Sequence, residues 1–317
     1  MAVKTEFSLR DIDAILSHYD LGVCTGHEAI PQGTVQTNYA ISTPQGEFVL
    51  RYYENRSWES VMFESDVLTY LTGHGYPCPN PREDRLGSYV GIHNDKPYIL
   101  FDFIEGSPVE HPTWQQREQL IHKAAELQLI TSDFQSIYTP YRWNYTPALC
   151  RALAKEQAIA GNSQAVWDKF SWLEAQLGNL DLPDDLPRGV CHCDFHFSNV
   201  LYMDGDLTAL LDFDDANITY LQFDLVGLIE YGAWPYTSDS LDLHAARDIV
   251  CTYTEIRPLS TLEKRHFIDV YKLSILFDCV WYFARDTGDD FYEKQKIDYL
   301  SRQGRHSLTQ ALFESGG

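Results

Sequence analysis

The sequence has 317 residues, of which 44% are hydrophobic and 22% charged, a composition typical of a folded globular protein. Asp and Glu number 46 against 24 Lys and Arg, which gives a formal net charge of −22. A field of that sign repels nucleic-acid phosphates and anionic lipid head groups, and this excludes a general nucleic-acid or membrane-surface binding protein.

The N-terminal part of the chain carries the signals of several strands and two helices. Ser8 and Asp11 form a capping-box pattern, so a helix is expected to begin at Leu9. A Pro-Gln-Gly turn at 44–46 separates two β-rich stretches and predicts a hairpin. The expected elements of this part are a helix from Leu9, strands over 34–41 and 47–53, a helix over 57–72, and strands over 89–92 and 97–103.

Beyond residue 103 the predicted elements are mainly helices. Thr113 and Gln116 form a second capping box, and Ser260 and Glu263 form a third. An Asp-Gly pair at 204–205 predicts a tight turn between two short strands. The expected elements of this part are helices over 113–130, 145–158 and 163–177, strands over 189–192, 199–203 and 207–212, and a long helix from 260 to about Arg285.

The contrast between these two parts predicts two domains. Residues 1–103 are expected to form a small β-rich lobe, and residues 104–317 a larger and mostly helical lobe. Segregated strands and helices of this kind are typical of an α+β fold. A cleft between two unequal lobes is a usual place for a ligand, so a binding site is expected there.

The chain reads as a cytoplasmic protein. Its first residues lack the apolar segment of a signal peptide, and no run of about 18 apolar residues predicts a membrane span. Seven cysteines are scattered along the sequence without the spacing of a disulfide framework, which favours a reducing compartment.

Three polar residues past the middle of the chain point to chemistry. Asp194 and Asn199 bracket a short loop between two strand-like segments, and Asp212 ends the next apolar strand. A carboxylate at the tip of a buried strand loses hydration unless a partner compensates it, and Mg²⁺ on nucleotide phosphates is such a partner. Phosphoryl transfer needs one carboxylate at the acceptor hydroxyl, and an amide oxygen plus a second carboxylate on Mg²⁺.

The spacing of these residues resembles a known family. His192-x-Asp194, then Asn199 and, thirteen residues later, Asp212, resemble the catalytic loop and metal-binding aspartate of the kinase-like phosphotransferases. That group includes aminoglycoside phosphotransferases, choline kinases and type II homoserine kinases. The resemblance covers most of the chain, with further similar segments at 33–39, 46–51, 76–81, 98–106, 221–225 and 257–263. The last of these, Arg-Pro-Leu-Ser-x-x-Glu, looks most like type II homoserine kinases.

The resemblance implies a bilobal protein-kinase-like α+β fold with ATP and Mg²⁺ as cofactors. Asp194 would act as the catalytic base or orient the acceptor hydroxyl, and His192 would be a structural member of the same loop. Asn199 and Asp212 would be the Mg²⁺ ligands. Asp224 would brace the catalytic loop.

The resemblance also implies a nucleotide site in the smaller lobe. Its residues would be Gly33, Asn38, Arg51, Glu64, Asp102 and Phe103. Arg51 stands where the family often has a phosphate-pairing lysine, and Arg differs from Lys in reach and geometry. Glu64, on the following helix, would hold Arg51 in place.

Together these features predict an ATP- and Mg-dependent phosphotransferase that acts on a hydroxyl of a small amine-bearing molecule and resembles homoserine kinase. An aminoglycoside kinase and a choline or ethanolamine kinase are alternatives, and a nucleotide-binding protein that has lost catalysis is an alternative of another class. Asp214 could contact metal or substrate, or only cap a turn. Glu230 and Asp278 could receive an ammonium group, or be paired acids within a helix.

Overall fold

A computed structural model describes residues 4–31, 35–234, 238–281, 283 and 292–314. The chain divides into two units, each assembled from separate stretches of sequence. The first unit comprises the residues up to 112 together with 133–142 and 197–214, and the second comprises 113–132, 143–196 and the residues from 215 onward.

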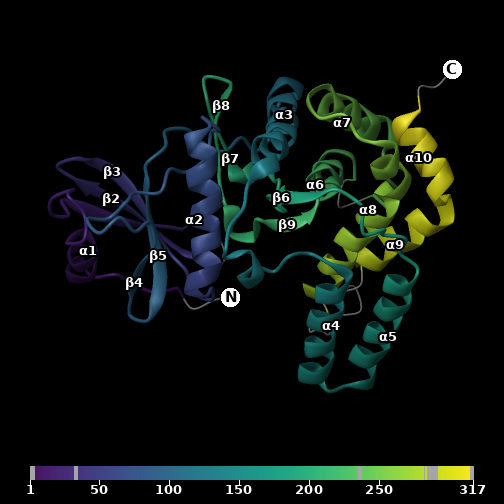
Figure 1. Ribbon diagram of the computed structural model, residues 1–317, viewed down its shortest axis with the longest axis horizontal. Coiled ribbons are helices and arrows are strands. Elements are labelled where there is room, and N and C mark those ends of the chain that lie inside the picture. Colours follow the sequence, from purple (N-terminus) through teal and green to yellow (C-terminus); the bar gives the residue numbers. More distant parts are fainter. Residues whose placement is uncertain (1–3, 32–34, 235–237, 282, 284–291, 315–317) are drawn as a thin grey trace. The chain divides into compact units, whose positions relative to one another are not determined.

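A five-stranded antiparallel sheet in the order β1-β2-β3-β5-β4 forms the centre of the first unit (Figure 1). Both predicted hairpins are present in it, as β2–β3 and β4–β5. The strands are β1 Gly26–Ile30, β2 Thr37–Thr43, β3 Gly46–Tyr52, β4 Gly91–His93 and β5 Lys96–Asp102.

The two faces of the sheet carry different partners. Phe48 and Leu50 of β3 are buried in a cluster with helix α1 (Leu9–Leu16), which begins at the predicted Ser8 capping box. Side chains alternate along a strand, so Arg51 points to the opposite face. Helix α2 (Trp58–Gly73) packs beside β5 (Figure 1).

A separate hairpin of the first unit, outside the five-stranded sheet, carries the residues that precede Asp212. Strand β7 (Val200–Met203) pairs antiparallel with β8 (Asp206–Leu210). The predicted turn between them is present, with positive φ angles of 54° at Asp204 and 93° at Gly205. Because Leu210 ends β8, Asp212 follows the strand by two residues.

The second unit is mainly helical. Its strands β6 (Arg188–Cys191) and β9 (Asn217–Tyr220) pair antiparallel and lead into the loop of Asp194 and into helix α6. The helices of this unit are α3 Trp114–Ile130, α4 Pro147–Gly161, α5 Gln164–Gly178, α6 Gln222–Ala233, α7 Leu243–Ile256, α8 Thr261–Trp281, α9 Tyr292–Gln303 and α10 Arg305–Phe313 (Figure 1).

The structure confirms the α+β class and most of the predicted elements. The capping box of Thr113 and Gln116 starts α3. The prediction missed the strands β1 and β9, which are short and, for β1, mostly exposed. The predicted end of the long helix at Arg285 lies outside the described residues. In the described part of the chain, no helix is long and apolar enough to cross a membrane.

Candidate functional site

Arg51 and Asp212 form an ion pair in the first unit. Arg51 Nη2 lies 2.5 Å from Asp212 Oδ1, with 13% of the arginine side chain and 38% of the aspartate side chain exposed. Burial lowers the pKa of Arg51, but Asp212 and the neighbouring Tyr53 and Glu64 outweigh it, so the pKa lies well above its usual value. The pair therefore combines a permanent cation with a carboxylate that solvent still reaches.

The backbone bends sharply at Asp212. Its φ of +65° lies in the left-handed region, which few residues other than glycine adopt and which Asp tolerates better than most. Leu211 N donates a 2.6 Å hydrogen bond to Asn199 O, so the segments of the two predicted metal ligands are joined through the backbone. Such backbone outliers concentrate at functional sites.

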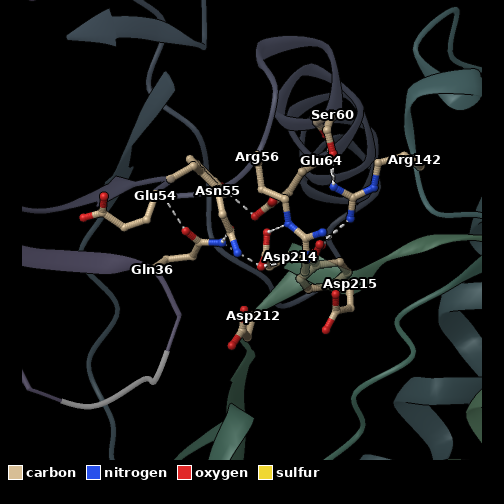
Figure 2. Close-up of polar contacts among 12 residues, drawn as sticks. Gln36, Glu54, Asn55, Arg56, Ser60, Glu64, Arg142, Asp212, Asp214 and Asp215 are labelled. Atoms are coloured by element: carbon tan, nitrogen blue, oxygen red, sulfur yellow. Dashed lines mark hydrogen bonds and ion pairs between the residues drawn. The ribbon is translucent and has the colours of Figure 1, made fainter. Parts of the chain in front are cut away.

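Asp214 lies in a buried polar network beside that bend, shown in Figure 2. Arg56 donates to both of its oxygens, with Nε–Oδ1 and Nη2–Oδ2 distances of 2.9 and 3.0 Å, and Gln36 Nε2 donates to Oδ2 at 2.9 Å. Burial raises the pKa of Asp214, but the guanidinium groups of Arg51 and Arg56 outweigh it and bring the pKa to about 2. Both carboxylate oxygens thus already accept hydrogen bonds from the protein.

Arg142 ties the same segment to helix α2. Its Nη1 donates to Ser60 Oγ at 3.0 Å and to Ser60 O at 3.1 Å, and its Nη2 donates to Asp214 O at 2.5 Å (Figure 2). Arg142 is buried. The side chain of Asp214 and its backbone are therefore held by different arginines, and the residues that follow β8 have little freedom.

In the described part of the chain, Glu64 forms no hydrogen bond or ion pair with Arg51. It is buried and accepts a 2.8 Å hydrogen bond from Tyr53 OH. Among the described residues, neither Glu64 Oε2 nor Arg51 Nε has a hydrogen-bond partner. Burial raises the pKa of Glu64 to about 7, against the lowering effect of Arg51. Glu64 thus acts on Arg51 through charge, while Asp212 holds the direct contact.

The other residues of the expected nucleotide site lie at different points of the sheet. Asn38 in β2 pairs directly with Arg51 in β3. Asp102 ends β5 and accepts a 2.7 Å hydrogen bond from Asn80 Nδ2. Phe103 has an exposed side chain, but its backbone N–H donates to Glu47 O at 3.2 Å. Gly33 lies outside the described residues.

In the second unit, Asp224 holds the backbone of the loop that bears Asp194. Its Oδ2 accepts from His192 N at 3.2 Å, and its Oδ1 accepts from Cys193 N at 3.0 Å. His192 is fully buried, and its Nδ1 accepts from Asp194 N at 3.2 Å. Cys193 has a φ of +64°, so the loop turns immediately before Asp194. The Asp194 side chain ends up partly exposed on a braced loop.

A group of acids lies on helices α6, α8 and α9 of the second unit. Lys296 Nζ contacts Glu230 and lies 2.9 Å from Glu293 Oε2, and Tyr271 OH donates to Glu230. Burial, then the charges of Glu293 and Glu230, raise the pKa of Asp278 to about 8, and Asp194 adds to the same effect. Among the described residues, Glu230 and Glu293 share the ammonium group of Lys296, and their charges act on the buried carboxyl group of Asp278; Glu230, Asp278, Glu293 and Lys296 are called the acidic cluster below.

The residues near Asp212 suit a hard metal ion whose remaining ligands are water molecules or phosphate oxygens. In the described residues, no group of three or more His, Cys, Asp or Glu side chains could hold a metal ion. Asp212 and Asn199 would offer a carboxylate and an amide oxygen. Mg²⁺ accepts such a small protein set because it keeps several waters and takes further oxygens from phosphates.

Sequence reasoning missed the residues that hold the site together. Gln36, Arg56 and Arg142 meet Asp214 across 178, 158 and 72 residues of sequence. No local pattern marks any of them. The only sequence signal for Arg56 is indirect: a second aspartate after Asp212, if buried, needs a cation to neutralise it.

Comparison with known proteins identifies clear relatives. A sequence profile described as the phosphotransferase enzyme family matches residues 26–259. The homoserine kinase of Parvibaculum lavamentivorans is 28% identical over 281 residues, which cover 83% of this chain and 81% of that protein. The homoserine kinase of Brucella melitensis biotype 2 is 27% identical over 331 aligned positions, which cover 100% of this chain and 98% of that protein.

Solved structures show the same fold at low sequence identity. Amicoumacin kinase hAmiN, in complex with AMP-PNP, Ca²⁺ and Ami, has a TM-score of 0.69 and 17% identity, and the alignment covers 96% of this chain and 94% of that one. Choline kinase from Cryptosporidium parvum has a TM-score of 0.59 and 16% identity, with 91% and 93% covered. These similarities confirm the predicted kinase-like α+β fold.

Proposed function

The chain belongs to the phosphotransferase enzyme family and is a small-molecule kinase, and we propose that it transfers the γ-phosphoryl group of ATP, with Mg²⁺, to a hydroxyl of a small amine-bearing molecule. The observation that carries this proposal is the braced loop, in which Asp224 fixes the backbone at His192 and Cys193 and leaves the Asp194 carboxylate partly exposed. A carboxylate held in this way can orient a substrate hydroxyl.

Asp194 has the role of hydroxyl acceptor in this proposal. Its carboxylate would accept a hydrogen bond from the attacking hydroxyl and take up the proton as the new oxygen–phosphorus bond forms, while the bond between the γ-phosphorus and the bridging oxygen breaks and ADP leaves. His192 holds the loop conformation, because its Nδ1 accepts from the backbone N–H of Asp194. The positive φ of Cys193 gives the turn that presents Asp194.

Asn199 and Asp212 would hold Mg²⁺, and Arg51 would pair with phosphate oxygens. Bound Mg²⁺ supplies charge that offsets the triphosphate during transfer. The guanidinium of Arg51 remains fully charged beside Asp212 and can donate two parallel hydrogen bonds to a phosphate, which a lysine cannot do. Asp214 would have a positioning role, because Arg56 and Gln36 already occupy its two oxygens.

The acidic cluster supports an amine-bearing substrate. In the described part of the chain, Glu230 and Glu293 pair with the ammonium group of Lys296 and their charges disfavour ionisation of Asp278, so a second ammonium group would stabilise the ionised form of Asp278. Homoserine is the first candidate, since two curated homoserine kinases match most or all of the chain. Aminoglycosides and choline are the alternatives that the kinase-like structural relatives suggest, and ethanolamine is an amino alcohol of the same kind as choline.

Coupled ADP release tests the proposal. Purified protein with ATP and Mg²⁺ would be offered homoserine, ethanolamine, choline and an aminoglycoside in turn, with the phosphorylated product identified by mass spectrometry. We expect alcohol-dependent ADP release with one of them. ATP binding without turnover on any alcohol would favour the nucleotide-binding protein that has lost catalysis, with Arg51 in place of the usual lysine as its first sign.

A further inference from the structure

The side chain of Arg257 contacts Glu263 and Tyr253, and the sequence alone does not reveal the contact with Tyr253. Arg257 and Glu263 are both buried, and Arg257 Nη2 lies 2.5 Å from Glu263 Oε1. The other Glu263 oxygen accepts from Ser260 N at 2.9 Å and so caps helix α8. Arg257 Nη1 also donates to Tyr253 OH at 3.5 Å. One terminal nitrogen of the guanidinium therefore pairs with Glu263, and the other donates to Tyr253.

From Tyr253 the hydrogen bonds continue to the brace of the catalytic loop. Tyr253 OH donates to Gln128 Oε1, and Gln128 Nε2 donates to Asp224 Oδ2 at 3.1 Å and to Leu221 O at 2.7 Å. Asp224 in turn accepts the backbone N–H groups of His192 and Cys193. Both Tyr253 and Gln128 are buried, so no exchange with bulk water competes for these bonds.

The donors in this chain all point the same way. Arginine donates to the tyrosine oxygen, the tyrosine hydroxyl donates to the glutamine carbonyl, and the glutamine amide donates to the carboxylate of Asp224. Each group that accepts one hydrogen bond donates the next, so every bond polarises its neighbour. Consecutive hydrogen bonds of this kind are stronger than isolated ones. A carboxylate buried as deeply as that of Asp224 also requires a full set of donors, because an unmade hydrogen bond there is expensive.

We infer that Gln128, Tyr253 and Arg257 are positioning residues, which fix the rotamer of Asp224 and through it the backbone that presents Asp194. The inference rests on the proposed function only for the role of Asp194. The hydrogen-bonded relay from Arg257 through Tyr253 and Gln128 to Asp224 lies within the second unit and does not depend on that role. It assigns the Arg257–Glu263 pair a task beyond capping helix α8, since the pair holds the far end of the chain of donors in place.

Two substitutions test the relay in the full-length protein. Tyr253→Phe removes one oxygen atom, and Gln128→Leu removes both donors to Asp224 and Leu221. Tyr19→Phe, at a buried tyrosine of the first unit, is the matched control. The first readout is hydrogen exchange of peptides that contain the amides of residues 192 and 193, measured by mass spectrometry. We expect these amides to exchange roughly tenfold faster in Gln128→Leu, less so in Tyr253→Phe, and unchanged in Tyr19→Phe.

The second readout separates positioning from general stability. With the alcohol that the ADP-release screen identifies, kcat should fall roughly tenfold or more in Gln128→Leu while KM for ATP stays within about threefold of the original value. Unchanged exchange at residues 192 and 193 in both variants would overturn the relay. If Gln128→Leu does not fold, Tyr253→Phe alone decides. If no alcohol is phosphorylated, the exchange measurement still decides the relay, and only the proposed function fails.

Discussion

Arg51 and Asp212 neutralise one another across the first unit, with Nη2 and Oδ1 2.5 Å apart. The carboxylate proposed to bind a metal therefore has a built-in cationic partner. An ion pair of this kind costs little when both partners are kept, whereas removal of one partner leaves the other charge uncompensated. Metal and phosphate would offer each member of the pair a new partner of the right sign.

Arg51→Ala should therefore weaken the use of ATP. The substitution removes the cation proposed to meet the phosphates, and we expect KM for ATP to rise by roughly 10–100-fold. Steady-state kinetics with ATP as the varied substrate measures this effect. Arg85→Ala is the control, because Arg85 forms an exposed ion pair with Asp20. An equal change in both variants would show that general charge, not the position of Arg51, is responsible.

Asp194→Asn should abolish turnover and spare nucleotide binding. The amide keeps the shape of the side chain but cannot take the proton of a hydroxyl, so we expect kcat to fall by roughly 10³-fold. ATP affinity, measured by calorimetry with Mg²⁺ present, should stay within about twofold. Asp206→Asn, at the exposed first residue of β8, provides a matched comparison. A variant with near-normal turnover would remove Asp194 from the reaction.

Arg56→Met should destabilise the first unit. Asp214 is 6% exposed and its charge is held by Arg56, so the loss of the guanidinium leaves a buried carboxylate without its main partner. Breaking a buried pair in this way costs roughly 3–5 kcal/mol of unfolding free energy. Urea denaturation of Arg56→Met, Asp214→Asn and the double variant measures the coupling. Strictly additive single effects would contradict the direct interaction.

The sequence predicts the local parts of this protein better than the contacts between them. The three capping boxes and both hairpins of the sheet depend on residues close in sequence, and all are present. The hydrogen bond between Tyr53 and Glu64 was not predicted, because it depends on how α2 packs on the sheet. Gln36 and Arg56 meet Asp214 only after folding, and no periodicity or turn chemistry records such long-range pairs.

Glu64 should make the unfolding free energy depend on pH. Burial raises its pKa from 4.5 to about 7, so the folded state binds a proton that the unfolded state has already released between these values. The sign is therefore negative: stability falls as pH rises from about 4.5 to about 7, by up to about 3 kcal/mol, and is constant above that range.

Glu64→Gln tests that dependence. The amide keeps an acceptor for Tyr53 OH, and Arg51 keeps Asp212 as its partner. Urea unfolding at several pH values should show a flatter profile than that of the original protein, and a higher stability at neutral pH. Glu47→Gln, at an exposed position of β3, is expected to leave the profile unchanged. An identical slope in Glu64→Gln and the original protein would assign the pH dependence to another group.

Asp278 should make binding of an amine-bearing substrate depend on pH. Its pKa is raised to about 8 by burial and by Glu293 and Glu230, so most of the population is uncharged at pH 7. An ammonium group binds the ionised form better, and KM for the amine should fall as pH rises from about 7 to about 9. Asp278→Asn should remove this trend and leave KM high at both ends. If the trend survives the substitution, or if an amine-free alcohol shows it equally, the ammonium group does not bind at the acidic cluster.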